Sequence, residues 1–254
     1  MTGASSGIGA ELARQLARHG ARVAIAARRA DRLETLAAEL RGMGAEVFAV
    51  GCDVADPASV TRALAAVEAR LGAPDVAILN AGIGESRRID EFSVAWVRRI
   101  VETNLFGVLY FVEPLLRSML ARGAGTIAVT SSLSRDRAMP QVGAYAASKA
   151  ALSAVVESLG IDAASRGVRF VTVEPGFVKS PMTDRNRFRM PFMVPTDRAA
   201  AIMLSGIARG VPLVRFPWPT AAMTWVFRML PARLFRFAAR LLVPKGDLKA
   251  PESG

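Results

Sequence analysis

Short apolar runs alternate along the chain with longer segments whose apolar residues recur every three or four positions. The short runs are typical of strands buried in a parallel sheet, and the longer segments of amphipathic helices. The predicted strands cover residues 22–27, 46–50, 75–79, 126–130, 169–173 and 212–216. The predicted helices cover residues 30–40, 56–71, 144–165 and parts of 92–120. This regular alternation predicts an α/β fold, a single-domain doubly wound parallel sheet of the Rossmann type.

A glycine-rich turn opens the chain and leads into an amphipathic segment that ends near Gly20. The turn has the sequence Thr2-Gly3-Ala4-Ser5-Ser6-Gly7-Ile8-Gly9. Its glycines allow a tight turn and the close approach of a ligand, and the free N–H groups at the start of the next helix favour a pyrophosphate. We therefore expect a dinucleotide phosphate site here, although the spacing differs from G-x-G-x-x-G.

Only Met1 precedes this turn, whereas a dinucleotide-binding turn normally follows a buried strand. That strand is central in a doubly wound sheet, and its loss leaves unpaired backbone groups on its neighbours. We therefore expect the first strand to be missing or truncated, with the natural start upstream of Met1. The alternative, a degenerate protein with a damaged cofactor site, is disfavoured because the later motifs are intact.

The composition narrows the classes of function. The chain has 254 residues, 52% of them hydrophobic, which suits one large domain. Cys52 is the only cysteine, so an intrachain disulfide is excluded and we expect a reducing, cytoplasmic compartment. His19 is the only histidine and precedes Gly20 where a helix ends, so we expect neither a Ser-His-Asp hydrolase nor a histidine-rich metal site.

The formal charge of +11 suggests an anionic partner, such as nucleic acid, a phosphate ligand or a membrane surface. The sequence has no zinc-knuckle spacing, no RNA-binding aromatic motif and no long basic run. We therefore predict no nucleic-acid partner. It shows neither a secretory signal nor the run of about 20 uncharged apolar residues that a membrane-spanning helix needs.

The best candidate for a proton donor is Tyr145, which stands four residues before Lys149. Residues four apart lie one above the other on a helix, so the ammonium of Lys149 would lie beside the phenol of Tyr145. A nearby positive charge favours the phenolate, so we expect a lowered pKa for Tyr145. By itself the Tyr-x-x-x-Lys spacing is unspecific, because an exposed helix carries it by chance.

Further polar side chains follow the predicted strands, at the edge where ligands of open α/β sheets bind. Arg28 and Arg29 come directly after Ala27, where an acid would suit a ribose 2′-hydroxyl and arginine accommodates a 2′-phosphate. Ser131 and Ser132 follow the strand at 126–130. Asn80-Ala81-Gly82 follows another strand, which by itself is also typical of an ordinary turn.

In this order the motifs resemble the short-chain dehydrogenase/reductase family over most of the chain. Residues 2–9 are similar to its TGxxxGxG turn, Asp53 to its adenine-contacting acid, and residues 80–82 to its sheet-supporting NAG. Residues 175–180 resemble the segment that holds the nicotinamide carboxamide, with Ser180 where threonine is common. The resemblance implies cofactor contacts by Thr2, Gly3, Ser5, Ser6, Gly7, Ile8, Gly9, Arg28, Arg29, Asp53, Val54, Asn80, Ala81, Gly82, Tyr145, Lys149, Pro175, Gly176, Val178 and Ser180.

Four residues match the family's catalytic tetrad: Asn104, Ser132, Tyr145 and Lys149, with Ser132 favoured over Ser131 by its spacing to Tyr145. The resemblance implies hydride transfer between NADP(H), rather than NAD(H), and a carbonyl or alcohol. Tyr145 would protonate the alkoxide, Ser132 would orient the carbonyl, Lys149 would bind the ribose, and Asn104 would position a water. The alternatives are an epimerase or dehydratase with a retained cofactor, and a non-catalytic membrane-associated binding protein.

We expect a catalytic domain over residues 1–217 and a basic helical extension over residues 218–254. The substrate loop, at about 176–195, is rich in Met, Phe and Arg, which indicates an apolar alcohol or ketone. After Pro231, one narrow helix face carries Arg233, Arg236 and Arg240, and the opposite side carries Leu234, Phe235, Phe237, Ala238, Leu241 and Leu242. Such a helix can lie in an anionic membrane interface, or it can close the substrate pocket or a subunit interface of the expected homo-oligomer.

Overall fold

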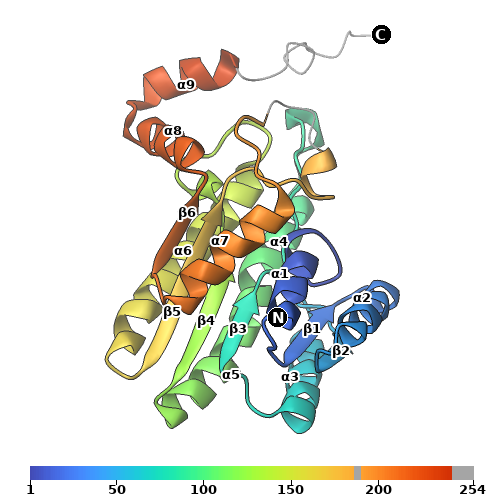
Figure 1. The fold of residues 1–254 in the computed structure, drawn as a ribbon. Helices are drawn as coiled ribbons and strands as arrows, with labels where there is room; N and C mark the ends of the chain where they lie inside the picture. Colours follow the sequence, from blue (N-terminus) through green and yellow to red (C-terminus); the bar gives the residue numbers. More distant parts are fainter. Residues whose placement is uncertain (186–189, 242–254) are drawn as a thin grey trace.

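The computed structural model describes residues 1–185 and 190–241 (Figure 1). Its strands are β1 (Val23–Ala27), β2 (Val47–Gly51), β3 (Val76–Leu79), β4 (Gly125–Thr130), β5 (Val168–Pro175) and β6 (Leu213–Phe216). Its α-helices are α1 (Gly7–Arg18), α2 (Ala30–Gly42), α3 (Pro57–Leu71), α4 (Val94–Val101), α5 (Gly107–Arg122), α6 (Gly143–Ala164), α7 (Thr196–Ala208), α8 (Trp218–Met229) and α9 (Ala232–Leu241). Short helical turns are η1 (Ile89–Glu91), η2 (Glu102–Phe106), η3 (Leu133–Arg135) and η4 (Thr183–Arg185).

All the strand pairs are parallel, in the orders β1-β2 and β3-β4-β5-β6. Residues Met1 and Thr2 lie between these two parts, and Thr2 bridges both Ala26 of β1 and Leu79 of β3. The N–H of Thr2 donates to the carbonyl of Ile78 at 2.9 Å, and the N–H of Ala26 donates to the carbonyl of Met1 at 2.9 Å. Two residues therefore stand in the place of the expected central strand, and they join the two parts of the sheet only at its carboxyl edge.

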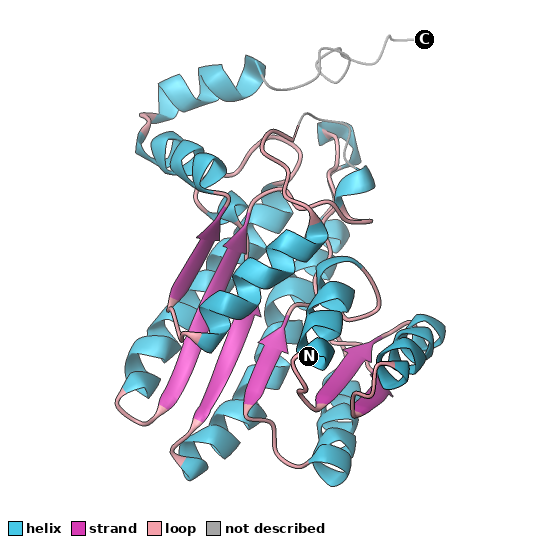
Figure 2. Cartoon of the chain, viewed as in Figure 1, coloured by secondary structure: helices cyan, strands magenta, loops and turns pink. Residues whose placement is uncertain are grey.

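Helices cover both faces of the sheet (Figure 2). On one face, α1 and α7 bury Leu12 and Met203 against Ile78 and Val171, while α2 packs on β1 and β2. On the other face, α3, α5 and α6 share one apolar cluster with the central strands. Burying these apolar faces is the main stabilising term in such a fold. The predicted α/β doubly wound architecture is confirmed.

The helical pattern predicted over parts of 92–120 is interrupted in the structure. Helix α4 ends at Val101, and α5 begins at Gly107 after η2, a π-helical turn that contains Asn104. Such turns insert an extra residue into a helix and frequently mark functional sites. Here the turn points Asn104 into the protein, where it is completely buried.

Candidate active site

The two serines that follow β4 have different surroundings. The hydroxyl of Ser131 donates to the carbonyl of Lys149 at 3.1 Å and lies 2.6 Å from the hydroxyl of Ser153. The hydroxyl oxygen of Ser132 accepts from the N–H and the hydroxyl of Ser134, at 3.2 and 3.0 Å, and it lies near enough to the phenol of Tyr145 to act on the pKa of that phenol. Ser131 thus anchors α6 to β4, whereas Ser132 is presented to the tyrosine.

Lys149 lies one helical turn beyond Tyr145 on α6 and is only 3% exposed. Its ammonium donates to the backbone carbonyl of Thr130 at 2.7 Å and lies 5.9 Å from the centroid of the Tyr145 ring. Burial disfavours the charged form and lowers the pKa of Lys149 from 10.5 to about 8. The four-residue spacing therefore does bring the two side chains together, but the ammonium is directed at the end of β4.

The pKa of Tyr145 differs from the sequence expectation. Burial of the phenol raises this pKa above 10.0, and the nearby hydroxyl of Ser132 opposes the rise only in part. The expected lowering by Lys149 is therefore wrong for the protein alone. The physical reason is that the phenolate loses hydration on burial, while the ammonium is hydrogen-bonded to Thr130.

Asn104 fixes the backbone next to Lys149. Its side-chain oxygen accepts from the N–H of Ile83 at 2.8 Å, and its NH₂ group donates to the carbonyl of Ile83 at 2.9 Å and to the hydroxyl of Ser148 at 3.1 Å. A Cβ at Gly82 would lie 3.2 Å from the Asn104 oxygen and 3.5 Å from Nζ of Lys149. Asn104, Gly82 and Lys149 therefore form one packed unit, and the water-positioning role of Asn104 stays a prediction.

The glycine-rich turn is held against the segment at 80–82. The hydroxyl oxygen of Thr2 accepts from the N–H groups of Asn80 and Ala81, both at 3.1 Å. Gly3 has φ +70°, and a Cβ there would lie 2.8 Å from the Cα of Ala81. A Cβ at Gly9 would lie 2.1 Å from the carbonyl oxygen of Gly3. These glycines are needed because the turn packs on its own backbone and on residue 81.

The start of α1 fits an anionic ligand. Ser6 is the N-cap residue, but its side chain makes no capping hydrogen bond, so it leaves the first N–H groups of α1 free of this partner. The guanidinium of Arg29 instead donates to the hydroxyls of Ser5 and Ser6, at 2.7 and 2.8 Å. A cation thus lies beside the expected phosphate site, and Arg28 is exposed next to it.

The remaining predicted cofactor residues line the same edge of the sheet. Asp53 accepts from the N–H of Ala55 at 3.1 Å, and the side chain of Val54 is buried against Gly107. The N–H of Gly176 donates to the carbonyl of Phe216 at 2.7 Å, directly after Pro175. Val178 is buried and bridges Val194, which closes the base of the predicted substrate loop. Ser180 faces the start of α1, since a Cβ at Gly7 would lie 3.3 Å from its Cβ.

A sequence model described as short chain dehydrogenase matches residues 1–190. The chain belongs to the short-chain dehydrogenase family. It is 40% identical over 242 residues to an uncharacterized oxidoreductase of Myxococcus xanthus (strain DK1622), covering 95% of this chain and 96% of that protein.

Solved structures of short-chain dehydrogenases have the same fold. An alcohol dehydrogenase from the archaeon Thermococcus sibiricus, complexed with 5-hydroxy-NADP, superposes with a TM-score of 0.75 at 34% identity, covering 85% of this chain and 93% of that chain. An actinorhodin polyketide ketoreductase variant with NADPH superposes with a TM-score of 0.79 at 29% identity, covering 87% of this chain and 95% of that chain. This short-chain dehydrogenase therefore belongs to a family of oxidoreductases with a nicotinamide dinucleotide cofactor.

Helices α8 and α9 follow β6 at the C-terminal end of the described chain. Phe235 and Ala239 of α9 are buried, but Leu234 and Phe237 are exposed along with the arginines of the helix. Only part of the predicted apolar side of this helix is therefore buried, namely the narrow stripe that contains Phe235. Leu242, the last residue of the predicted stripe, lies outside the described residues. In the part of the chain that the structure describes, no helix has both the length and the apolar composition to cross a membrane.

Several contacts at the site carried no sequence signal. Ser148, Ser153 and the carbonyl of Thr130 orient Asn104, Ser131 and Lys149, but serine and threonine are common in any chain. Within residues 1–185 and 190–241, no group of three or more His, Cys, Asp or Glu residues is placed to hold a metal ion.

Proposed function

We propose that this short-chain dehydrogenase transfers a hydride between NADP(H) and an apolar carbonyl or alcohol, with Tyr145 as the general acid and base. The observation that carries this proposal is the position of Ser132 beside Tyr145, next to buried Lys149 and at the same sheet edge as the glycine-rich turn. When bound, the nicotinamide supplies or accepts the hydride. Its phosphates would lie at the start of α1, on the N–H groups that the Ser6 side chain leaves uncapped.

The side chains have separate tasks in carbonyl reduction. Tyr145 donates its phenolic proton to the oxygen that becomes an alkoxide, and Ser132 donates a hydrogen bond to the same oxygen. Lys149 would supply positive charge to the ribose of a bound cofactor and to Tyr145, and Asn104 holds the backbone at Ile83 next to it. In alcohol oxidation the same groups act in reverse, with the tyrosine accepting the proton.

The chain contains two tyrosines, which gives a matched test of Tyr145. Tyr145→Phe should lower turnover by about 10²–10⁴-fold, typical of lost general acid catalysis, while cofactor still binds. Tyr110→Phe is the control, because this hydroxyl hydrogen-bonds to Glu102 on the α4 to α5 segment. Net NADPH oxidation with a panel of ketones, sterols and lipid-derived carbonyls identifies the substrate and separates reduction from epimerisation. Wild-type turnover by Tyr145→Phe contradicts the assignment.

For the cofactor, we propose NADP(H) over NAD(H). The guanidinium of Arg29 lies at the two serine hydroxyls of the turn, and Ala27 places no carboxylate there. Arginine makes charge-assisted, bidentate contacts with phosphate, which suits a 2′-phosphate on the ribose.

The cofactor proposal is tested by titrating NADPH and NADH into the free protein. Arg29→Ala should weaken NADPH binding by about 10–100-fold and leave NADH binding nearly unchanged, since charge-assisted hydrogen bonds contribute about 1.5–3 kcal/mol. Arg22→Ala is the control, because this exposed arginine lies at the other end of β1. Equal affinity of the wild-type protein for the two cofactors would overturn the proposal.

An apolar substrate is favoured by the wall of the site above Tyr145. A Cβ at Gly84 would lie 3.1 Å from the sulfur of Met182 and 3.7 Å from Cε2 of Tyr145, so Met182 and the tyrosine ring both lie beside Gly84. Phe192 and Met193 are exposed on the same loop. Met182→Ser should raise KM for an apolar ketone without weakening NADPH binding, and an unchanged KM contradicts this role.

The exposed apolar edge of α8 and α9 suits an anionic membrane surface as a docking site. Trp218 is 78% exposed, Leu234 57% and Phe237 68%, and residues 198–246 contain arginines and a lysine but no acid. The double substitution Leu234→Ser and Phe237→Ser should lower sedimentation with phosphatidylglycerol-containing vesicles, whereas Ile161→Ser should not, because Ile161 is an exposed residue of α6. Failure of the wild-type protein to sediment at low salt contradicts membrane docking.

The expected homo-oligomer has a separate candidate surface. Phe92, Val94 and Phe106 are exposed around α4 and η2. Burying these side chains against a second copy would remove apolar area from water. Sedimentation equilibrium measures the oligomeric state, and a monomer at micromolar concentration contradicts this expectation.

A further inference from the structure

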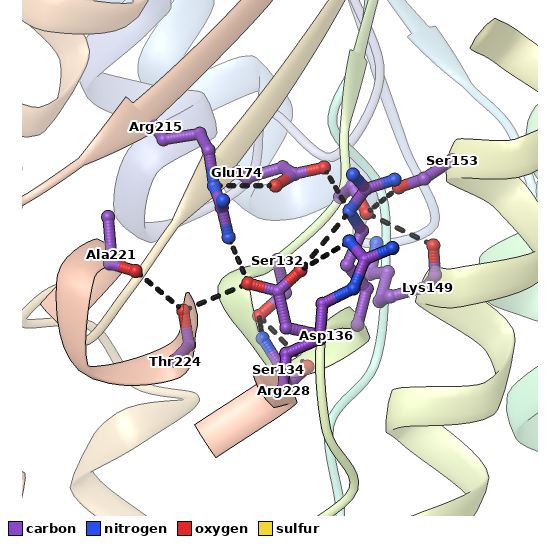
Figure 3. A network of polar contacts seen from close by, with 12 residues as sticks. Ser132, Ser134, Asp136, Lys149, Ser153, Glu174, Arg215, Ala221, Thr224 and Arg228 are labelled. Carbon is purple, nitrogen blue, oxygen red and sulfur yellow. Dashed lines mark hydrogen bonds and ion pairs between the residues drawn. The ribbon is translucent and has the colours of Figure 1, made fainter. Parts of the chain in front are cut away.

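A buried cluster of charged side chains lies next to the turn that carries Ser132 (Figure 3). The carboxylate of Asp136 is 1% exposed and contacts Arg215, Thr224 and Arg228, with 3.0 Å to the threonine hydroxyl and 3.8 Å to Arg228. The carboxylate of Glu174 is 0% exposed and pairs with Arg135 at 2.6 Å and with Arg215 at 3.1 Å. The mechanism proposed above uses none of these groups.

The cluster is held together by charge. Burial raises the pKa of Glu174, and the charges of Arg135 and Arg215 act against this rise. Removing one partner of a buried ion pair is strongly destabilising, because the remaining charge stays buried without compensation. The cluster members therefore constrain one another, although they come from the separate elements η3, β5, β6 and α8.

Asp136 lies one short helical turn from Ser132. The N–H of Arg135 donates to the carbonyl of Ser132 at 3.2 Å, and the N–H of Asp136 donates to the carbonyl of Leu133 at 3.3 Å. The N–H of Ser134, inside the same turn, donates to the hydroxyl oxygen of Ser132 at 3.2 Å. The hydrogen bonds of this turn therefore connect the backbone at Asp136 to the hydroxyl of Ser132.

The next residue extends the connection to the C-terminal helices. The guanidinium of Arg137 donates to the carbonyl of Arg228 on α8 at 3.4 Å and lies 4.4 Å above the ring of Phe235 on α9. A Cβ at Gly176 would lie 3.1 Å from the side chain of Thr220 and 3.3 Å from that of Leu133, so α8 also packs where the predicted nicotinamide segment meets η3. Helix α8 thus contacts both the η3 turn and the predicted nicotinamide segment.

We propose that Asp136 is a positioning residue for Ser132 and that, through Asp136, helix α8 is an obligatory part of the active site. The proposal rests on the proposed function, because it assigns Ser132 to the carbonyl oxygen. Arg215 and Thr224 hold the carboxylate of Asp136, and the η3 turn carries that position to the serine hydroxyl. Helix α8 therefore contributes to catalysis, in addition to the proposed role of the C-terminal helices in docking on a membrane surface.

The test is a double-mutant cycle in the full-length protein. Ser132→Ala should lower kcat by about 10²–10³-fold, the usual effect of losing one donor to a developing oxyanion. Asp136→Asn should lower kcat by about tenfold or more in the presence of Ser132, with the Kd for NADPH nearly unchanged. In the Ser132→Ala background the same substitution should have almost no further effect, because residues that act as a unit are non-additive.

Two further variants separate positioning from a general loss of stability. Thr224→Val removes one hydrogen bond to Asp136, keeps the shape and charge, and should give a smaller fall in kcat that also depends on Ser132. This variant decides the question if Asp136→Asn does not fold. Met119→Ala is the control, since this buried residue packs at the opposite end of β4, and it should lower the melting temperature without lowering kcat.

A structural readout independent of turnover is hydrogen exchange across η3. Faster exchange of the N–H groups at residues 134–136 in Thr224→Val than in the wild-type protein is expected. Equal falls in kcat with and without Ser132, or no change in kcat or exchange, would overturn the positioning role. Wild-type turnover by Ser132→Ala instead counts against the proposed function.

Discussion

Replacing Lys149 by methionine should stabilise the protein at neutral pH while it impairs the reaction. A fall in pKa from 10.5 to about 8 corresponds to a cost of about 3 kcal/mol for burying the ammonium. Methionine has a similar length and no charge to desolvate. The change also leaves the carbonyl of Thr130 without its 2.7 Å donor, which costs about 1–3 kcal/mol. At pH 7 we expect a net gain of up to about 2 kcal/mol.

The pH dependence of this difference isolates the lysine. Because the pKa of Lys149 is lower in the folded state, the unfolded chain binds more protons between pH 8 and pH 10.5, and the wild-type protein gains stability as pH rises through that range. The methionine variant lacks this gain. Its advantage over the wild type should therefore fall by about 2–3 kcal/mol between pH 7 and pH 10, whatever the loss at Thr130 costs.

Urea unfolding without cofactor at pH 7, 8.5 and 10 measures the free energy of unfolding of both proteins. Lys179→Met is the matched control, because this lysine is exposed and its replacement should give a difference that changes little with pH. A difference between Lys149→Met and wild type that stays constant from pH 7 to pH 10 would refute the reasoning. The ammonium would then be solvated in the folded protein.

Two paired substitutions test the packing of the site. Gly9→Ala should abolish cofactor binding, because its Cβ would lie 2.1 Å from the carbonyl oxygen of Gly3. Gly42→Ala has nothing within 4 Å of its Cβ, so it should be neutral or stabilising by up to about 1 kcal/mol. Calorimetric titration measures cofactor binding by both variants, and melting curves measure their stability. Ser131→Ala should lower stability by about 1–3 kcal/mol, since it leaves buried polar partners unsatisfied. Ser132→Ala should instead lower turnover with little change in melting temperature, and the opposite pattern would exchange the two roles.

The secondary structure was largely predictable, because hydrophobic periodicity and turn residues act locally. Strand β1 was predicted at 22–27 and lies at Val23–Ala27, and α6 was predicted at 144–165 and lies at Gly143–Ala164. The interruption of the 92–120 segment at Asn104 was not predictable, since the π-helical turn is fixed by tertiary hydrogen bonds to Ile83 and Ser148.

By itself the sequence determined the family, the order of the elements and which residue types meet at the carboxyl edge of the sheet, because these follow from spacing along one chain. Only the tertiary structure decided the direction in which the pKa values of Lys149 and Tyr145 shift, since both values depend on burial by other segments. The same holds for Asp136 and Glu174, which no motif marked and which pair with arginines from elements far apart in the chain. The tertiary structure also decided that Phe235 of α9 is buried and that Phe237 is exposed. The burial of a side chain and its long-range ion pairs depend on which segments pack against it. A helical pattern in the sequence does not specify those segments.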